Sequence, residues 1–212
     1  RWDEGEMVYC EAQLRFHDVG DFYGESQAWS NLGSLHLQRD RWTDAIACYK
    51  KALDFARTLT DRVGESRLEC NLGSAFHQMG DWVSARGSYE RALALSRELG
   101  DRLGEAQTQN NLGLLYYHAG DLSSAVEFSE KALTTFRVLS DLYGEGQALS
   151  NLAVIAEAHD DPLRAVTFYQ QSIQICRELG DRQGEATALM NLCFLLFRQQ
   201  RYDEVGIYAE HA

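Results

Sequence analysis

The residues with the greatest catalytic potential in this sequence are histidines flanked by carboxylates. His159-Asp160-Asp161 is the densest such group, and imidazole and carboxylate groups are zinc ligands. These three residues lie in a short polar stretch between two helical patterns, which favours a solvated turn over a metal site. HExxH, P-loop, GxSxG and dinucleotide-binding motifs are missing from the sequence. We therefore expect no catalytic residue, no metal and no cofactor, and predict that the chain is not an enzyme.

Asparagine has the spacing that points most clearly to binding. An Asn-Leu pair recurs every 40 residues, and we call its asparagines the Asn ladder: Asn31, Asn71, Asn111, Asn151 and Asn191. Asparagine inside a helix costs roughly half a kcal/mol relative to alanine. A side-chain amide both donates and accepts hydrogen bonds, which suits pairing with the backbone of an extended peptide. Alternatively, each asparagine bonds to the backbone of the neighbouring repeat, and the sequence leaves both interpretations open.

The ladder belongs to a repeat that runs from Gly20 to the end of the chain. Each repeat opens with the motif Asp-x-x-Gly-Glu, which starts at Asp21, Asp61, Asp101, Asp141 and Asp181. A fixed period of this length is typical of stacked units that each contact their neighbours. Apolar and small residues follow the motif at helical spacing, so every repeat predicts two helices.

Small residues and rings at fixed places predict how the two helices of a repeat pack. Position 1 of the successive repeats is Ser26, Ser66, Ala106, Gly146 and Ala186. Position 8 is always small, as in Gly73, and position 24 is a ring in three repeats, as in Tyr89, with Phe128 one residue early in the third. We expect the small residue to let the helices cross closely, with the ring filling the space beside it.

Polar turns separate the predicted helices. Pro162 stands at the start of a second helix, where its missing N–H costs nothing, and Gly100 and Gly180 are predicted C-caps. The aspartate of each Asp-x-x-Gly-Glu motif is a predicted N-cap. No strand precedes the glycine of this motif, so we expect it to pack one repeat against the next instead of binding phosphate.

The overall composition excludes several classes of function. Acidic residues outnumber basic ones 32 to 20 and the net charge is −12, whereas nucleic-acid-binding proteins neutralise phosphates with Lys and Arg. No apolar run approaches the roughly 18 residues of a membrane span. We therefore expect neither a nucleic-acid nor a membrane partner. The five cysteines are odd in number and lack CxxC spacing, which predicts packed, reduced thiols and a cytoplasmic location.

The second repeat shows the whole pattern in one place: Leu72-Gly73, Gly80-Asp81, Ala85, Tyr89 and Ala92. This set resembles the tetratricopeptide repeat (TPR), and the resemblance covers essentially the whole chain. The 40-residue period exceeds the usual 34 and is similar to that of LGN/Pins adaptors and, more loosely, kinesin light chains. The resemblance implies an all-α fold, a right-handed α-α superhelix (TPR solenoid) of antiparallel helix pairs.

We expect one continuous solenoid of about eleven helices. Residues 1–20 are predicted to be the second helix of a preceding repeat, followed by repeats at 21–60, 61–100, 101–140, 141–180 and a truncated 181–212. Because the chain begins and ends inside the pattern, we expect a fragment of a longer array. The uncovered ends, with Trp2, Phe194 and Phe197, are expected to self-associate end to end.

In the family that the chain resembles, the first helix of each repeat lines a concave groove. Carried onto this sequence, that implies partner contacts by the Asn ladder and by Gln27, Arg67, Gln107, Gln147, Asn110, His77, Tyr117 and His118. LGN-like arrays carry arginine at position 2 and bind acidic segments, but only Arg67 matches here. The Lys/Arg/Asn clamp of the family's chaperone-tail receptors is missing too.

These observations predict a scaffold or adaptor that binds an extended or helical segment of a partner protein in its groove. The alternative is a regulatory sensor arm of a larger signalling protein, which binds a peptide or another domain of its own chain. The sequence does not decide between the two.

Overall fold

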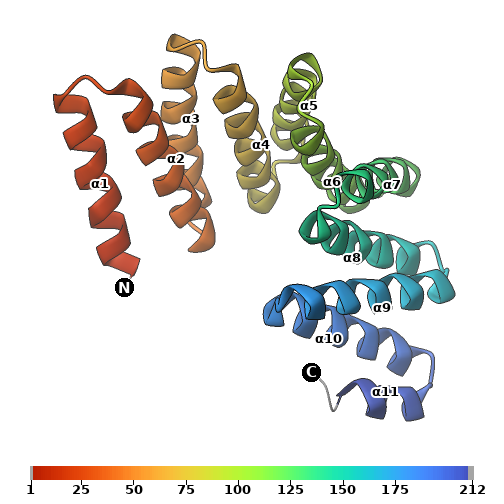
Figure 1. The fold of residues 1–212 in the computed structure, drawn as a ribbon. Helices are drawn as coiled ribbons and strands as arrows, with labels where there is room; N and C mark the ends of the chain where they lie inside the picture. Colours follow the sequence, from red (N-terminus) through yellow and green to blue (C-terminus); the bar gives the residue numbers. More distant parts are fainter. Residues whose placement is uncertain (1, 210–212) are drawn as a thin grey trace. The chain divides into compact units, whose positions relative to one another are not determined.

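The computed structural model describes the backbone of residues 2–209 and the side chains of residues 5–208. All secondary structure in this part of the chain is helical, in accordance with the predicted all-α fold (Figure 1). The helices are α1 Trp2–Asp18, α2 Phe22–Gln38, α3 Trp42–Thr58, α4 Arg62–Met79, α5 Trp82–Leu99, α6 Arg102–His118, α7 Leu122–Leu139, α8 Leu142–Ala158, α9 Pro162–Leu179, α10 Arg182–Arg198 and α11 Tyr202–Ala209.

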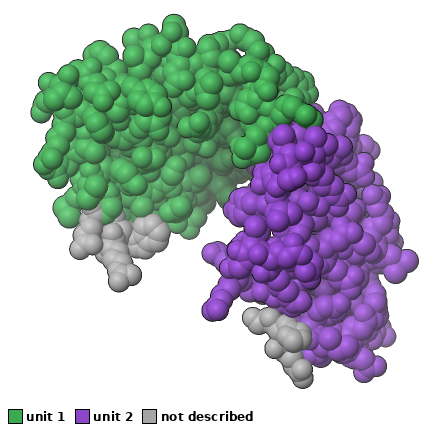
Figure 2. Space-filling view, viewed as in Figure 1, with its two compact units in different colours: residues 1–108 green, residues 109–212 purple. Residues whose placement is uncertain are grey.

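The chain divides into two compact units, residues 1–108 and 109–212 (Figure 2). The first holds α1 to α5 and the start of α6, and the second holds the rest of α6 and α7 to α11. In the first unit each helix from α1 to α5 packs on the next one in the chain, and in the second the same is true from α7 to α11. Each repeat thus contributes a first and a second helix, as the periodicity predicts.

Within a repeat, the small residue at position 8 faces the ring at position 24, as predicted. A Cβ atom on Gly73 would lie 2.5 Å from the ring of Tyr89, and one on Gly33 would lie 2.7 Å from the ring of Tyr49. Both distances are well inside van der Waals contact, so glycine is what lets these helices approach so closely. Each of the two tyrosines is 1% exposed, which makes this contact part of the core.

The third repeat solves the same packing problem differently. Phe128 stands one residue early and stacks on Tyr116, with ring centroids 5.4 Å apart and planes at 15°. Ser129 then takes the place of the ring, and a Cβ on Gly113 would lie 2.2 Å from its hydroxyl oxygen. The close approach of the two helices is therefore kept although the aromatic residue has moved.

The Asp-x-x-Gly-Glu motif joins each repeat to the one before it. All five aspartates accept a hydrogen bond from the glycine N–H of their own motif, which confirms the predicted N-caps. The glycine packs against the preceding second helix: a Cβ on Gly144 would lie 2.4 Å from the ring of Phe136. Gly100 and Gly180 adopt the left-handed conformation (φ 68° in both) and cap their helices as predicted.

The glutamate of the motif has a partner that the repeat pattern did not predict. An arginine in the last turn of the preceding second helix donates a hydrogen bond to it, as Arg137 does to Glu145 at 2.8 Å. The same ion pair recurs at Arg57–Glu65, Arg97–Glu105 and Arg177–Glu185. Because the arginines are about half exposed, each pair contributes at most about 1 kcal/mol. The motif as a whole is a structural joint.

Candidate functional site

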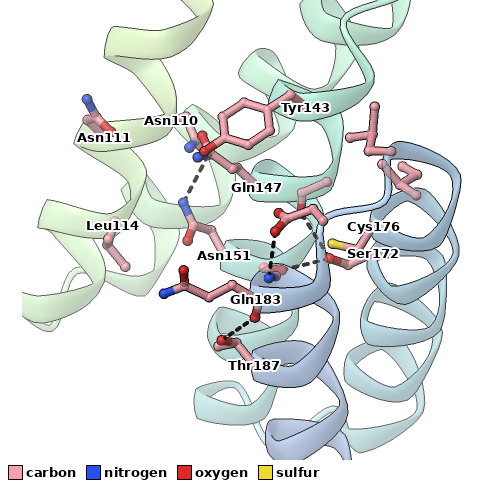
Figure 3. A pocket seen from close by; sticks show the side chains of 16 residues that line it. Asn110, Asn111, Leu114, Tyr143, Gln147, Asn151, Ser172, Cys176, Gln183 and Thr187 are labelled. Atoms are coloured by element: carbon pink, nitrogen blue, oxygen red, sulfur yellow. Dashed lines mark hydrogen bonds between the residues drawn. The ribbon is translucent and has the colours of Figure 1, made fainter. Parts of the chain in front are cut away.

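The second unit contains a cavity of about 510 Å³ between its first helices, which we call the groove cavity (Figure 3). Helices α6, α8 and α10 each contribute polar side chains to it, and α9 contributes a less polar surface. Its principal lining residues are Asn110, Asn111, Leu114, Tyr143, Gly146, Gln147, Ser150, Asn151, Ser172, Ile175, Cys176, Leu179, Asp181, Gln183 and Thr187.

One member of the Asn ladder in this cavity has a partner in the preceding repeat. Asn151 Nδ2 donates a hydrogen bond of 3.0 Å to Oδ1 of Asn110, which is only 5% exposed (Figure 3). The alternative interpretation of the ladder expected a bond to the neighbouring repeat's backbone; the partner here is a side-chain amide at position 5. This rung therefore connects α6 to α8 and orients both amides at the edge of the cavity.

The reactive side chains of the cavity are already committed to structural roles. Ser172 Oγ donates to the backbone oxygen of Gly146 at 3.1 Å and lies 2.8 Å from the hydroxyl of Ser150. Burial raises the pKa of the Cys176 thiol, and the negative charge of Asp181 acts in the same direction. That carboxylate in turn accepts the N–H of Gly184. The thiol is thus held in its protonated form, and one oxygen of the Asp181 carboxylate caps α10.

The side chains that remain available at the mouth are uncharged. Gln147, Gln183 and Thr187 are exposed, and Tyr143 at the edge is 59% exposed. Among the described residues, the amides of Gln147 and Gln183 make no hydrogen bond within the chain. An amide offers two donors and an acceptor, so the mouth presents hydrogen-bonding groups of both kinds without a net charge.

A smaller cavity in the first unit is formed by equivalent repeat positions. This Asn71 cavity measures about 100 Å³. It is lined by Val63, Ser66, Arg67, Cys70, Asn71, Ser96, Asp101, Gly104, Gln107 and Thr108. Arg67 is exposed, so this cavity has a positive charge at its mouth where the groove cavity has the neutral Gln147.

The predicted contact residues are thus divided between different places. Four of them line the groove cavity, namely Asn110, Asn111, Gln147 and Asn151, and three line the Asn71 cavity, namely Arg67, Asn71 and Gln107. The remaining six line neither of these two cavities: Gln27, Asn31, His77, Tyr117, His118 and Asn191. The Tyr117 and His118 rings are arranged edge to face with centroids 5.2 Å apart. For these six, partner contact stays a prediction.

Several lining residues were not predicted. Tyr143 and Gln183 are the second variable residue of their Asp-x-x-Gly-Glu motifs, and Ser172 and Ile175 belong to a second helix. The family's groove positions lie on first helices, so a mapping limited to them could not find α9. The motif offered a signal: its variable residues stand in the first turn of a first helix, next to position 1.

Neither a group of metal-ligating side chains nor a membrane-spanning helix occurs among the described residues. In that part of the chain, no group of three or more His, Cys, Asp and Glu side chains is arranged to hold a metal ion. Nor does any helix there have the length and apolarity that crossing a membrane requires. Phe194 and Phe197, predicted to be part of a self-associating end, are 62% and 58% exposed, and the Trp2 side chain lies outside the described residues.

Comparison with known families identifies the repeat. The model of the tetratricopeptide repeat family matches residues 24–98 and 65–138, which together make up more than half of the chain. This chain is a tetratricopeptide repeat protein. The resemblance inferred from Leu72-Gly73, Tyr89 and Ala92 is confirmed, and the likeness to LGN/Pins adaptors stays a prediction.

Solved structures of other TPR-like proteins share the fold. BtubC (BKLC) from P. vanneervenii has a TM-score of 0.81 at 20% identity, with 100% of this chain and 89% of that chain covered. A Rap protein complexed with Competence and Sporulation Factor has a TM-score of 0.81 at 15% identity, covering 89% and 53% of the two chains. A signal transduction ATPase with numerous domains (STAND) and a tetratricopeptide repeat sensor, from Pyrococcus horikoshii, has a TM-score of 0.72 at 19% identity, covering 92% and 30%.

These identities are low, so the likeness shows the fold alone. The TPR chain spans about half of the Rap protein and under a third of the STAND protein. None of the curated proteins compared with the sequence matches it significantly.

Proposed function

We propose that this TPR protein is an interaction module that binds an extended, largely uncharged segment of a partner protein in the groove cavity. The family and the similar structures support a protein-interaction or regulatory role in general. The particular site and ligand are inferred from the geometry of the second unit.

The observation that carries the proposal is the chemistry of the cavity mouth. Gln147 and Gln183 present amides without a partner among the described residues, and the Asn151–Asn110 bond orients two more. A peptide in extended conformation presents alternating N–H and C=O groups, which pair with amides of either polarity. Leu114 and Ile175 add apolar surface for one side chain of the segment.

The charge distribution favours a neutral segment. The only ionisable carboxylate in the lining, that of Asp181, is engaged by the Gly184 N–H. A charged ligand would have to give up its hydration without gaining an opposite charge in return. Binding is therefore expected to depend weakly on salt, in contrast to charge-steered association.

A peptide selection tests this proposal on the intact chain. Random peptides displayed on phage are selected for binding, and the affinities of the enriched peptides are measured by fluorescence anisotropy. Gln147→Ala and Gln183→Ala should each weaken binding about fivefold or more, because a buried hydrogen bond left unmade costs roughly 1–3 kcal/mol. Gln171→Ala is the matched control, since Gln171 is an exposed residue of α9 that lines neither cavity.

The result can also go against the proposal. Enriched peptides that bind both glutamine variants as well as the parent chain would place the interface elsewhere. Affinity that collapses between low and physiological salt would show that charge, and not the amide-lined mouth, dominates recognition. Asn111→Ala tests whether the predicted ladder takes part beyond Asn151.

A regulatory sensor arm is the second candidate. It is supported by the fold shared with the STAND protein, whose tetratricopeptide repeats are described as a sensor, and with a Rap protein bound to Competence and Sporulation Factor. In such an arm the segment bound in the groove cavity would come from the same polypeptide or from a signalling peptide. Cross-linking of the full-length gene product through a cysteine placed at Gln147 separates a segment in cis from a partner in trans.

A further inference from the structure

A second cavity of the second unit shares no lining residue with the groove cavity. It measures about 400 Å³ and lies between α7, α8 and α9. We call it the Phe168 cavity; it is lined by Ser123, Val126, Leu152, Ala156, His159, Asp161, Arg164 and Phe168. Its walls are apolar and its polar residues include the exposed His159 and Arg164.

The repeat register shows what is missing from this cavity. Ala156 stands at position 11 and Phe168 at position 23 of the fourth repeat. In the third repeat these positions hold Tyr116 and Phe128, whose rings stack at 5.4 Å and 15°. In the second repeat position 11 is also a ring, Phe76. The fourth repeat therefore keeps the aromatic residue at position 23 and lacks the ring that stacks on its equivalent.

The other residues that line the cavity also suit an aromatic ring. Val126 and Leu152 supply apolar walls, and Leu152 is 2% exposed. The guanidinium of Arg164 lies 5.4 Å from the centroid of the Phe168 ring, so one face of that ring is already paired with a cation. Arg164 also donates a hydrogen bond to Glu130 at 3.2 Å, which holds it at the rim. For scale, an apolar cavity of about 150 Å³ binds benzene.

We propose that the Phe168 cavity binds an aromatic side chain, Phe or Tyr, presented by a partner protein. The incoming ring stacks on Phe168 and occupies the place that Tyr116 occupies beside Phe128. This contact uses the second helices α7 and α9 together with α8, and none of its lining residues belongs to the groove cavity. It can therefore be tested independently of the function proposed above.

Capped amino acids serve as probes for the intact chain. N-acetyl-tyrosinamide and N-acetyl-phenylalaninamide are titrated into the ¹⁵N-labelled protein, with N-acetyl-leucinamide as the aliphatic comparison. We expect saturable shifts of the Val126, Leu152, Ala156 and Phe168 amides at millimolar concentration. The two aromatic probes should bind several-fold more tightly than the leucine probe, since aromatic pairing is worth about two- to tenfold beyond apolar burial.

Three variants and one control test the geometry. Ala156→Tyr supplies the missing ring from within the chain and should weaken the aromatic probes at least about tenfold. Should that variant not fold, Phe168→Leu keeps apolar volume without a stacking face and should remove the preference for aromatic over leucine probe. Tyr116→Ala should create a second aromatic site beside Phe128. Phe194→Leu alters an exposed ring outside the cavity and should change nothing.

Specific outcomes would overturn the proposal. Equal affinity for the leucine and aromatic probes, or unchanged binding in Ala156→Tyr, would show that stacking on Phe168 is not the basis of recognition. Absence of saturable shifts at the named amides would show that the cavity does not take such a ring. Binding of p-cresol together with exclusion of the capped amino acids would assign the cavity to free small aromatic molecules instead of a protein partner.

Discussion

The groove cavity of the second unit and the Asn71 cavity of the first are built largely from the same repeat positions, yet their volumes are about 510 and 100 Å³. Position 1 is Ser66 in the smaller cavity and Gly146 in the larger. The Ser66 hydroxyl donates to the backbone oxygen of Ala92 at 3.1 Å and contacts the hydroxyl of Ser96 at 2.9 Å. That side chain lies where the groove cavity is open.

In the second unit the corresponding hydrogen bond runs the other way. Ser172, at the position of Ala92, donates to the backbone oxygen of Gly146. The two helices are thus still linked, but the linking hydroxyl comes from the second helix and leaves the surface of the first helix free. An exchange of serine and small residue between the two helices thus accompanies the difference in volume between the two cavities.

The largest predicted effect tests the close helix crossing inside a repeat of the first unit. Gly73→Leu should destabilise the chain by about 1–3 kcal/mol, because its side chain would overlap the Tyr89 ring. Gly87→Leu is the control, since a Cβ there would meet only the end of Arg91 at 3.5 Å. Urea unfolding followed by circular dichroism measures both. An unchanged midpoint for Gly73→Leu would show that the crossing is not tightly packed.

The exchange at position 1 can be reversed in both directions. Ser66→Gly removes buried hydrogen bonds and puts glycine into a helix, and should cost about 2 kcal/mol. Gly146→Ser should cost less than about 1 kcal/mol, because a Cβ there lies 3.2 Å from Cγ2 of Ile175 and needs only a small shift. The serine should nevertheless weaken peptides that bind the groove cavity. Equal losses of stability in the two variants would show that Ser66 and Gly146 do not play the different roles described for position 1 of the two cavities.

The ladder residues Asn151 and Asn71 should differ in what their side chains contribute to stability. Asn110→Ala leaves Asn151 without its partner and should cost about 1 kcal/mol. The side-chain amide of Asn71 makes no hydrogen bond among the described residues, so Asn71→Ala should leave the unfolding midpoint almost unchanged. A double-mutant cycle on Asn110 and Asn151 isolates their coupling. Equal effects of the two single variants would mean that the ladder acts alike in both units.

The smallest expected effect concerns pH. Position 11 holds the buried His36 in the first repeat and Ala156 in the fourth. Burial lowers the pKa of His36 below its ordinary value, and the charge of Arg41 adds to this. The unfolded chain therefore binds this proton at a higher pH than the folded chain does. The contribution of neutral His36 to the free energy of unfolding is present above the unfolded pKa and is lost as pH falls through the folded pKa. His36→Phe should make the free energy of unfolding less dependent on pH in this range. If the free energy of unfolding changed with pH in the same way in parent and variant, a contribution of His36 to the pH dependence would be excluded.

Much of the fold could be predicted from the sequence because the same structural positions recur in every repeat. Position 8, position 24 and the capping aspartate each occur several times, so a single exception such as Phe128 did not obscure the pattern. The partner of Glu145 was missed because Arg137 precedes the motif, in the helix of the previous repeat. Contacts between repeats are recognisable in sequence only when the repeat boundary is known in advance.

The site was less predictable for a physical reason. The ladder amides were visible at once, but the volume of the cavity depends on Gly146 and Ser172, which are unremarkable residues when read singly. Likewise, the Phe168 cavity lies where position 11 is Ala156 and not an aromatic residue. The missing ring is recognised only by comparison with Tyr116, which occupies the same position in the third repeat. The volume of a cavity depends on side chains from at least two helices, whereas a sequence pattern describes one helix at a time.

The Asp-x-x-Gly-Glu joint also bears on how such an array changes length during evolution. Its aspartate and glycine act within one repeat or on the helix just before, and its glutamate pairs with an arginine eight residues earlier. A recombination event between the same position of two repeats therefore restores every one of these contacts at the new junction. Whole repeats can be gained or lost in the gene without inventing an interface, while a crossover out of register would break the cap, the close packing and the ion pair together.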